Sequence, residues 1–227
     1  MRISHLFILL AASAMLTACD FLDEYNPNSV TVGNYYTSEE DIVASLNGVY
    51  TSLTQSYVAD NYHYFTDVRA NATVVANSGA NSGIPYQFYN YTLTEENVYV
   101  YNRYSQLYKI ISRANTLFAH LGDVSYATPS ARDTYEAEAR FLRALSYYWL
   151  VTEWGDVPLV LKVLESTEEV RANNYRRPKA EIYQAIFDDL KYVTESPLLD
   201  VQPASACGKV SKAAAWALWG KALLQQA

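Results

Sequence analysis

The stretch from Glu136 to Val160, EAEARFLRALSYYWLVTEWGDVPLV, constrains the fold more strongly than any other part of the chain. Its spacing predicts a helix with one apolar face, made of Phe141, Leu145, Tyr148, Trp149 and Thr152. Gly155 can adopt the left-handed conformation that ends a helix, and Pro158 cannot continue one. We interpret a long aromatic helix with such an ending as a packing element and expect no catalytic residues in it.

Charged and polar residues beside the apolar stripes of the predicted helices also have structural roles. Glu136 and Arg140 have the i, i+4 order that favours an ion pair on one helix. Arg140 and Arg143 could be mistaken for ligand-binding residues, but we expect them to pair with carboxylates on packed helices. Asn115 lies beside the stripe of a helix predicted over Tyr99–Leu121, and we expect neighbouring backbone groups to satisfy its buried amide.

Capping residues predict where several helices begin. Ser38 with Asp41 has the capping-box pattern, and Ser130 with Asp133 marks the start of the aromatic helix. Ser211 precedes a last helix that runs to the end of the chain. Together with the apolar stripes, these signals predict helices from Ser38, over Tyr99–Leu121, from Ser130, over Lys179–Thr194 and from Ser211.

The last predicted helix contains a repeat-like pattern. Trp216, Trp219, Gly220 and Leu223 have the spacing of the tetratricopeptide pattern W-x2-L-G-x2-Y, with Trp219 and Leu223 as substitutes. Such a repeat is one helical hairpin that buries its apolar face only by stacking on neighbours. Since nothing follows to cover this face, we infer that the sequence is the N-terminal part of a longer protein.

The composition limits the classes of partner. The formal net charge of −7 argues against binding nucleic acid, which needs a basic surface, and against anionic membrane surfaces. Tyrosine is abundant, with 21 Tyr against 7 Phe and 4 Trp. Its flat ring with a hydroxyl suits cores that reach the surface and surfaces that bind sugars or peptides. Cys19 and Cys207 do not predict a disulfide.

The N-terminus predicts export. Residues 1–18 contain the basic Arg2 and an apolar core that is too short for a comfortable membrane span, as in a secretion signal. The signal ends in Leu-Thr-Ala-Cys, which is similar to a bacterial lipobox, so we expect Cys19 to become the lipidated first residue. The alternative is an ordinary signal peptide with an incidental cysteine. Residues 19–37 are polar and predict an extended tether.

Residues 56–97 show no helical periodicity and form the candidate binding segment. About forty irregular residues inside a domain are usually functional or disordered, and the aromatic content argues against disorder. Sugar sites combine aromatic rings with amide, carboxylate and guanidinium groups, and this segment contains all of them. The candidate ligand-binding residues are Asp67, Arg69, Asn71, Asn77, Asn81, Tyr86 and Tyr89. The alternative is that the tyrosines pack the segment onto the helices and the asparagines close turns.

The sequence contains no recognisable catalytic pattern. His63 and His120 lie outside any H-E-x-x-H motif, and there is neither a G-x-S-x-G elbow nor a phosphate-binding loop. Cys207 has no nearby histidine motif, and adjacent acids such as Asp188 and Asp189 are interpreted as parts of solvated faces. Nothing indicates the paired carboxylates of a glycoside hydrolase. We therefore expect no enzymatic activity, no metal ion and no cofactor.

The motif AEARFLRALSYYWLVTEWGDVPLV resembles the signature of the SusD/RagB family of surface lipoproteins in Gram-negative bacteria. The segment Cys-Asp-Phe-Leu-Asp at Cys19 and the context YKIISRAN around Asn115 are similar to the same family. Asp23 and Glu24 resemble the acidic signal that sends such lipoproteins to the outer face of the outer membrane. The resemblance implies an all-α fold of tetratricopeptide-like helical hairpins with a long irregular segment. Residues 38–227 would be its N-terminal helical domain, incomplete at the C-terminus.

The resemblance also implies a function. Members of the family capture oligosaccharides or other nutrients and deliver them to a SusC-like TonB-dependent outer-membrane transporter. Part of their ligand surface comes from the region between the first helix and the second long helix, which here holds the candidate residues. The expected partners are the transporter, the nutrient and the membrane through the lipid anchor, with no nucleic acid. The alternatives are a repeat-type lipoprotein scaffold that organises outer-membrane proteins and an envelope hydrolase.

Overall fold

The computed structural model describes residues 35–73 and 83–227 of the 227-residue chain. The predicted signal peptide, Cys19, most of the predicted tether, Asn77 and Asn81 lie outside the described residues. The part from Tyr36 to Ala227 forms one compact unit. None of the helices that the structure describes is both long enough and apolar enough to cross a lipid bilayer.

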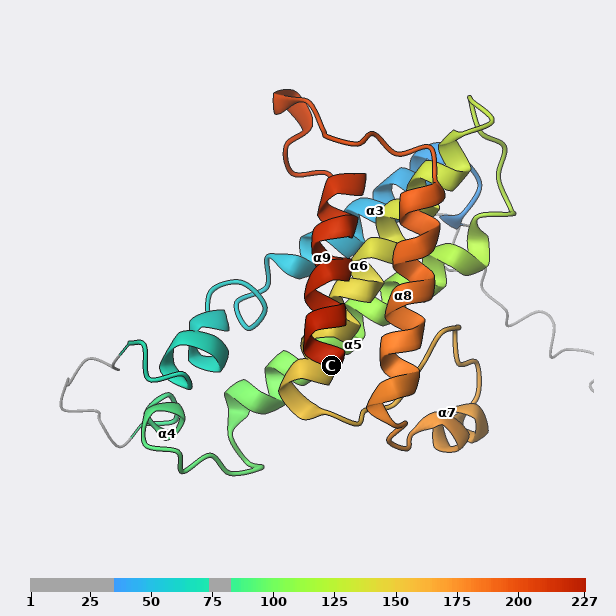
Figure 1. Cartoon of the computed structure of the whole chain (residues 1–227). Coiled ribbons are helices and arrows are strands. Elements are labelled where there is room, and N and C mark those ends of the chain that lie inside the picture. The colour runs from blue at the N-terminus through green and yellow to red at the C-terminus, as the bar shows by residue number, and fades with distance from the viewer. Residues whose placement is uncertain (1–34, 74–82) are drawn as a thin grey trace, which may run out of the picture. The chain divides into compact units, whose positions relative to one another are not determined.

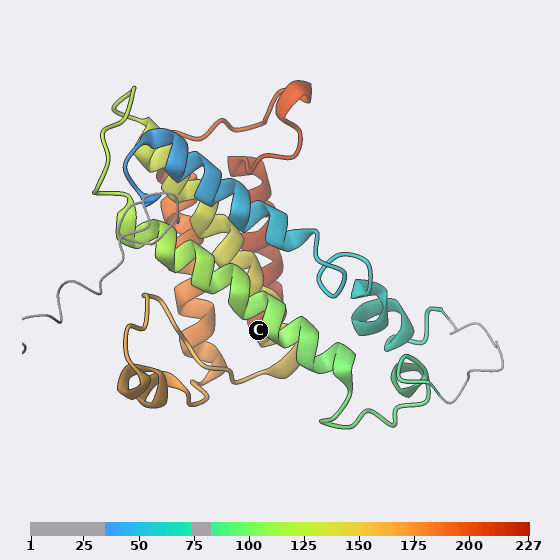
Figure 2. The same ribbon diagram turned by 180° about the vertical axis from the view of Figure 1, so that it is seen from behind.

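The unit is built from long helices that pack around α6 (Figures 1 and 2). In the described part of the chain they are α3 (Glu39–Leu53), α5 (Val98–His120), α6 (Ala131–Trp154), α8 (Lys179–Glu195) and α9 (Lys212–Gln226). Helix α6 contacts each of the other four, while α3 also packs on α5 and α8 on α9. The shorter elements are η2 (Tyr64–Val68), α4 (Tyr86–Tyr89), α7 (Thr167–Asn173) and η3 (Ala204–Ala206). The predicted all-α fold is confirmed.

Two of the three predicted helix caps have the expected hydrogen bonds. Ser38 and Asp41 form a complete capping box at α3, and the Ser211 hydroxyl accepts the Ala214 N–H at 3.3 Å at the start of α9. Ser130 marks the start of α6 as predicted, since the helix begins at Ala131, but its side chain makes no capping hydrogen bond. Its backbone, with φ −90° and ψ −10°, is already in the helical region, whereas a capping serine needs an extended backbone to reach the next amides.

The buried face of α6 differs from the predicted one. The predicted face of Phe141, Leu145, Tyr148, Trp149 and Thr152 is only partly buried. The fully buried apolar residues include Ala139, Leu142, Ala144, Tyr147 and Leu150. The reason is that four helices surround α6, so that most of its circumference is covered and a single apolar stripe no longer identifies the core. The predicted end of the helix is correct, since Gly155 has a positive φ of 73°.

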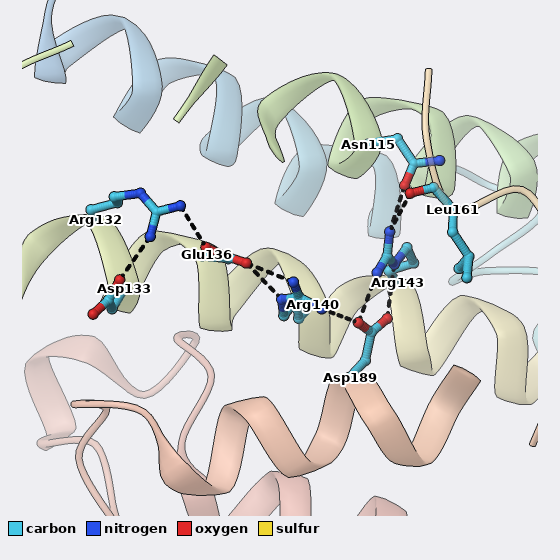
Figure 3. Close-up of polar contacts among 8 residues, drawn as sticks. All are labelled: Asn115, Arg132, Asp133, Glu136, Arg140, Arg143, Leu161 and Asp189. Carbon is cyan, nitrogen blue, oxygen red and sulfur yellow. Dashed lines mark hydrogen bonds and ion pairs between the residues drawn. The ribbon is translucent and has the colours of Figure 1, made fainter. Parts of the chain in front are cut away.

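A buried ionic network joins α5, α6 and α8 (Figure 3). Arg143 donates from Nε and Nη2 to the two carboxylate oxygens of Asp189, both at 2.8 Å, and from Nη1 to Asn115 Oδ1 at 2.7 Å. Arg140 donates to Asp189 Oδ1 and to Glu136 Oε1, also at 2.8 Å. Both arginines therefore pair with carboxylates as predicted, whereas Asp189 is buried and not on a solvated face.

Asn115 extends this network to the chain that follows α6. Its Nδ2 donates to the carbonyl oxygens of Val160 at 3.0 Å and Lys162 at 3.2 Å, so the predicted backbone partners are present. Arg143 Nη1 donates to a third carbonyl in this stretch, that of Leu161, at 3.1 Å. The Gly-Asp-Val-Pro turn thus leads directly into a segment that side chains of α5 and α6 hold in place.

One face of α9 is apolar and partly exposed. Trp216 and Leu223 are 59 % and 50 % exposed, as expected for the repeat-like pattern, while Leu218 is buried. Trp219 was predicted to lie on the same uncovered face, but its ring stacks on Phe187 of α8, with centroids 6.1 Å apart. Helices α8 and α9 therefore form a packed hairpin, in which the pattern residue Trp219 contributes to the contact.

Candidate functional site

The candidate binding segment folds around a small aromatic core of its own. Phe65, Val68 and Phe88 are buried together and are separate from the main core. The rings of Phe65 and Phe88 meet edge to face with centroids 4.9 Å apart, and Tyr64 contacts Tyr99 of α5 in the same geometry at 5.4 Å. This arrangement fits the alternative that aromatic residues pack the segment onto the helices, for these buried rings at least.

Several amide side chains in this segment form local structure. Asn97 caps α5 by accepting the N–H groups of Tyr99 and Val100, and its Nδ2 donates to Gln87 Oε1 at 2.7 Å. Asn90 Oδ1 accepts the Thr92 hydroxyl at 2.6 Å. These amides already have protein partners, so the alternative that such residues close turns is correct for them.

A fully buried arginine connects the segment to the helices. Arg103 on α5 has no exposed surface and donates to both carboxylate oxygens of Glu153 on α6 at 2.6 Å. Its Nη1 also donates to the backbone carbonyls of Tyr57 and Val58, at 3.0 and 3.3 Å. Burial raises the pKa of the Glu153 carboxyl, and the hydrogen bonds from Arg103 oppose that rise.

A cavity of about 190 Å³ lies where this segment meets the end of α6. Its apolar walls are Phe65, Phe88, Leu93, Val100 and Trp154, and its polar lining is Arg69, Thr94 and Glu153. Trp154 also packs against the main core, so the cavity adjoins that core. Aromatic walls with a few polar groups are the usual lining of a small-ligand site.

The structure separates the predicted candidates into two groups. Asp67, Arg69 and Asn71 are exposed on and just after η2, and only Arg69 lines the cavity. Tyr86 and Tyr89 are half-buried on α4 with ring centroids 5.4 Å apart. In residues 35–73 and 83–227, no hydrogen bond or ring contact joins either tyrosine to Asp67. The structure does not describe Asn77 and Asn81.

The candidates that the structure describes make no side-chain hydrogen bonds within the described part of the chain. The side-chain carboxylate of Asp67 accepts no hydrogen bond from another described residue, and the guanidinium of Arg69 and the side-chain amide of Asn71 form none, in contrast to Asn90 and Asn97. The same holds for the hydroxyls of Tyr86 and Tyr89. These groups can therefore bind a ligand without breaking an internal hydrogen bond, although Arg69 also interacts electrostatically with Glu153.

Sequence reasoning missed residues that shape this region. Tyr91 is 67 % exposed, has an unusual positive φ of 57° and donates from its hydroxyl to the Arg69 carbonyl at 3.0 Å. Arg103 and Glu153 were also missed, although a signal for Arg103 existed. It lies four residues before Leu107, on the stripe that becomes the buried face of α5, and a charged residue there requires a partner.

A second hollow lies between α5 and the connector that contains α7. Two adjoining cavities of about 150 and 330 Å³ share Tyr108, Val160, Leu164 and Val170 as lining residues. The tyrosine hydroxyl is already used, because it donates to the Pro158 carbonyl at 2.6 Å. This mainly apolar hollow contains none of the predicted candidates, so we place the candidate site at the cavity beside Arg69.

These helical pairs, stacked around α6, place the chain among all-α proteins built from tetratricopeptide-like hairpins. Residues 20–224 match the SusD-like family that is described as starch-binding and associating with the outer membrane. Because this match covers most of the chain, the protein belongs to the SusD-like family, as the resemblance of its aromatic helix indicated.

Curated relatives extend beyond this chain. It is 27 % identical to SusD-like protein P2 of Formosa agariphila over 216 residues, which are 95 % of this chain and 41 % of the relative. SusD-like protein P25 of the same organism is 25 % identical over 236 residues, covering 100 % of this chain and 44 % of the relative. The chain therefore spans less than half the length of these relatives.

Solved structures share the fold. A laminarin binding SusD-like protein has a TM-score of 0.71 and 30 % sequence identity, with 84 % of this chain and 41 % of that chain covered. The surface glycan-binding protein A of Bacteroides thetaiotaomicron, in complex with laminarihexaose, has a TM-score of 0.69 and 21 % identity, with 83 % and 39 % covered. At that identity the second likeness shows the fold alone.

Proposed function

We propose that this protein is a non-catalytic glycan-binding lipoprotein and that the candidate binding segment forms part of its binding surface. The observation that carries the proposal is the aromatic cavity beside Arg69, together with the unused polar groups of the neighbouring candidates. The family and the laminarin-binding relative support the same class of ligand.

The chemistry of the segment matches that of a sugar. A pyranose ring has flat C–H faces that pack against aromatic rings, and its hydroxyl groups both donate and accept hydrogen bonds. In the proposed site, Tyr86 and Tyr89 supply ring surfaces. Carboxylate, guanidinium and amide groups would bind the hydroxyls, and these come from Asp67, Arg69, Asn71, Asn77 and Asn81.

The proposal includes an anchor and a delivery step. Lipidation at Cys19 would hold the protein on the outer membrane at the cell surface, and a SusC-like TonB-dependent transporter would receive the bound glycan. The lipobox-like sequence and the family description support this part. Co-purification from outer membranes tests it: a transporter partner supports delivery, whereas capture of an assembly machine without a transporter favours the scaffold alternative.

Calorimetric titration of the full-length mature protein tests the binding site. Laminarihexaose and maltohexaose serve as probes, because the relatives and the family description name laminarihexaose and starch. We expect Tyr86→Ala and Tyr89→Ala each to weaken binding by roughly tenfold, which corresponds to about 1.4 kcal/mol. Tyr175→Ala is the matched control, because this tyrosine is 48 % exposed outside the candidate segment. Binding of neither probe, or unchanged affinity in both variants, would contradict the proposal.

A further inference from the structure

We propose that Arg103 is a positioning residue for the candidate site and acts by clamping the start of the candidate binding segment onto α5 and α6. Arg103 itself lies below the surface and has no exposed area, so it cannot contact a bound glycan. Its effect on affinity rests on the proposed function, whereas its effect on the order of the segment does not.

The hydrogen bonds of Arg103 join three parts of the chain. Nε and Nη2 donate to the two carboxylate oxygens of Glu153 on α6, both at 2.6 Å, and so form a bidentate ion pair. Nη1 donates to the carbonyl oxygens of Tyr57 and Val58, which lie between α3 and η2. One planar guanidinium on α5 therefore holds both α6 and the chain that leads into the candidate segment.

Aromatic rings enclose the same guanidinium. Its central carbon lies 5.0 Å from the ring centroid of Tyr62, 4.9 Å from that of Phe65 and 5.5 Å from that of Trp149. Tyr62 and Phe65 belong to the segment, while Trp149 belongs to α6. A cation at this distance from aromatic rings is attracted to their faces, so the arginine holds side chains of the segment as well as its backbone.

The clamp extends to the walls of the cavity. Phe65 and Glu153 both contact Arg103 and both line the cavity. Arg69 lies four residues after Phe65 and also lines it. A change at Arg103 should therefore move two walls of the cavity and the nearby guanidinium of Arg69, although Arg103 does not line the cavity.

A buried ion pair of this kind is expected to contribute more to positioning than to stability. Removing one partner leaves an uncompensated buried charge and is strongly destabilising, whereas replacing both by apolar residues of similar volume is often neutral. The double replacement of Arg103 and Glu153 by methionine therefore separates the two roles. It restores the balance of charge but cannot supply the hydrogen bonds to the carbonyls of Tyr57 and Val58.

Hydrogen-exchange mass spectrometry on the full-length mature protein measures the clamp. We expect Arg103→Met and Glu153→Met each to lower the thermal midpoint, and the double variant to recover most of that loss. In the double variant, peptides within residues 57–69 should still exchange at least about tenfold faster than in the wild-type protein, with those of α8 unchanged. Wild-type protection of residues 57–69 in the double variant would overturn the proposal.

Arg113→Met is the matched control. Arg113 also lies on α5 and donates to the Gly48 carbonyl and the Ser52 hydroxyl of α3, at 2.7 and 2.5 Å. This variant removes a comparable arginine contact between helices but none to the candidate segment. Exchange in residues 57–69 should stay at the wild-type rate, and an equal increase in this control would mean that Arg103 has no specific role.

Titration with laminarihexaose tests glycan binding separately from the clamping role of Arg103. If the wild-type protein binds, we expect the double variant to bind at least about tenfold more weakly and Arg113→Met to bind normally. A wild-type protein that does not bind laminarihexaose, with residues 57–69 loosened in the double variant, supports the clamp and counts against the proposed function for this sugar. A wild-type protein that binds, with these residues still protected in the double variant, sustains the proposed function and overturns the clamp.

Discussion

Asp189 is the residue on which the buried ionic network depends. It is 2 % exposed and accepts hydrogen bonds from Arg140 and from both Nε and Nη2 of Arg143. With Glu136 as the second carboxylate partner of Arg140, two positive and two negative charges lie together. Each buried charge is therefore compensated, which is the condition for keeping such a network inside a core.

Asp189→Ala should destabilise the protein by about 3–5 kcal/mol, because it leaves the guanidinium of Arg143 buried without its carboxylate. Urea unfolding followed by circular dichroism measures the difference. Asp188→Ala is the control, since Asp188 is exposed and its side chain accepts a hydrogen bond from Gln184 at 2.8 Å. Similar losses of stability in the two variants would contradict a stabilising role for the buried network.

At the scale of residues, the sequence predicted that Arg140 and Arg143 pair with carboxylates, but it did not predict which carboxylates these are. Arg140 and Arg143 lie on a helix that must be packed, so their pairing with carboxylates followed from the cost of burying a lone charge. Asp189 is 46 residues away from Arg143 along the chain. Its position three residues after Ile186 and four before Val193 places it on the apolar stripe of α8, whereas Asp188 lies off that stripe and is exposed. The stripe could have indicated that Asp189 is buried, but its pairing with these arginines depends on the packing of α8 on α6.

The turn after α6 shows how a single backbone conformation determines where an element ends. Gly155 has φ 73° and ψ −119°, and its N–H still donates to the Val151 carbonyl at 3.0 Å. Glycine reaches this mirror-image region readily because it lacks Cβ. The turn then leads to Val160, whose N–H donates to the Tyr147 hydroxyl at 2.7 Å.

Gly155→Ala should destabilise the protein by about 1–3 kcal/mol, because an L side chain is strained in this region even though the added Cβ would meet no atom within 4 Å. Gly48→Ala is the opposite control: it lies inside α3, its added Cβ also has free space, and alanine there should stabilise by about 0.5–1 kcal/mol. Thermal unfolding of both variants measures these shifts. A stabilising effect at Gly155 would contradict the assigned turn.

At the scale of elements, helix ends were easier to predict than helix faces. The starts of α3 and α9 follow from local hydrogen bonds at Ser38 and Ser211, which the sequence makes visible. The buried face of α6 depends on four packing partners, so the stripe containing Trp149 was assigned to the core although it is only partly buried. Periodicity indicates that a face is apolar but not how many neighbours cover the helix.

At the scale of the molecule, the family and the all-α fold were predictable, and the arrangement of the candidate site was not. A specific motif on α6 was enough to indicate the SusD-like family. The composition of residues 62–91 indicated a binding segment, but rings such as Phe65 and Phe88 are used for packing. Placing Arg69 at a cavity required knowing how η2 and α6 meet, which depends on contacts distant in sequence.

We propose that a glycan binds at the candidate binding segment. Hydrogen exchange of the full-length mature protein, with and without a saturating glycan from a panel that includes laminarihexaose, tests it most directly. We expect slower exchange on binding within residues 62–73 and 83–94, with no change in α7 or α9. Protection confined to α7, α9 or other residues outside 62–94, with residues 62–94 unaffected, would contradict it.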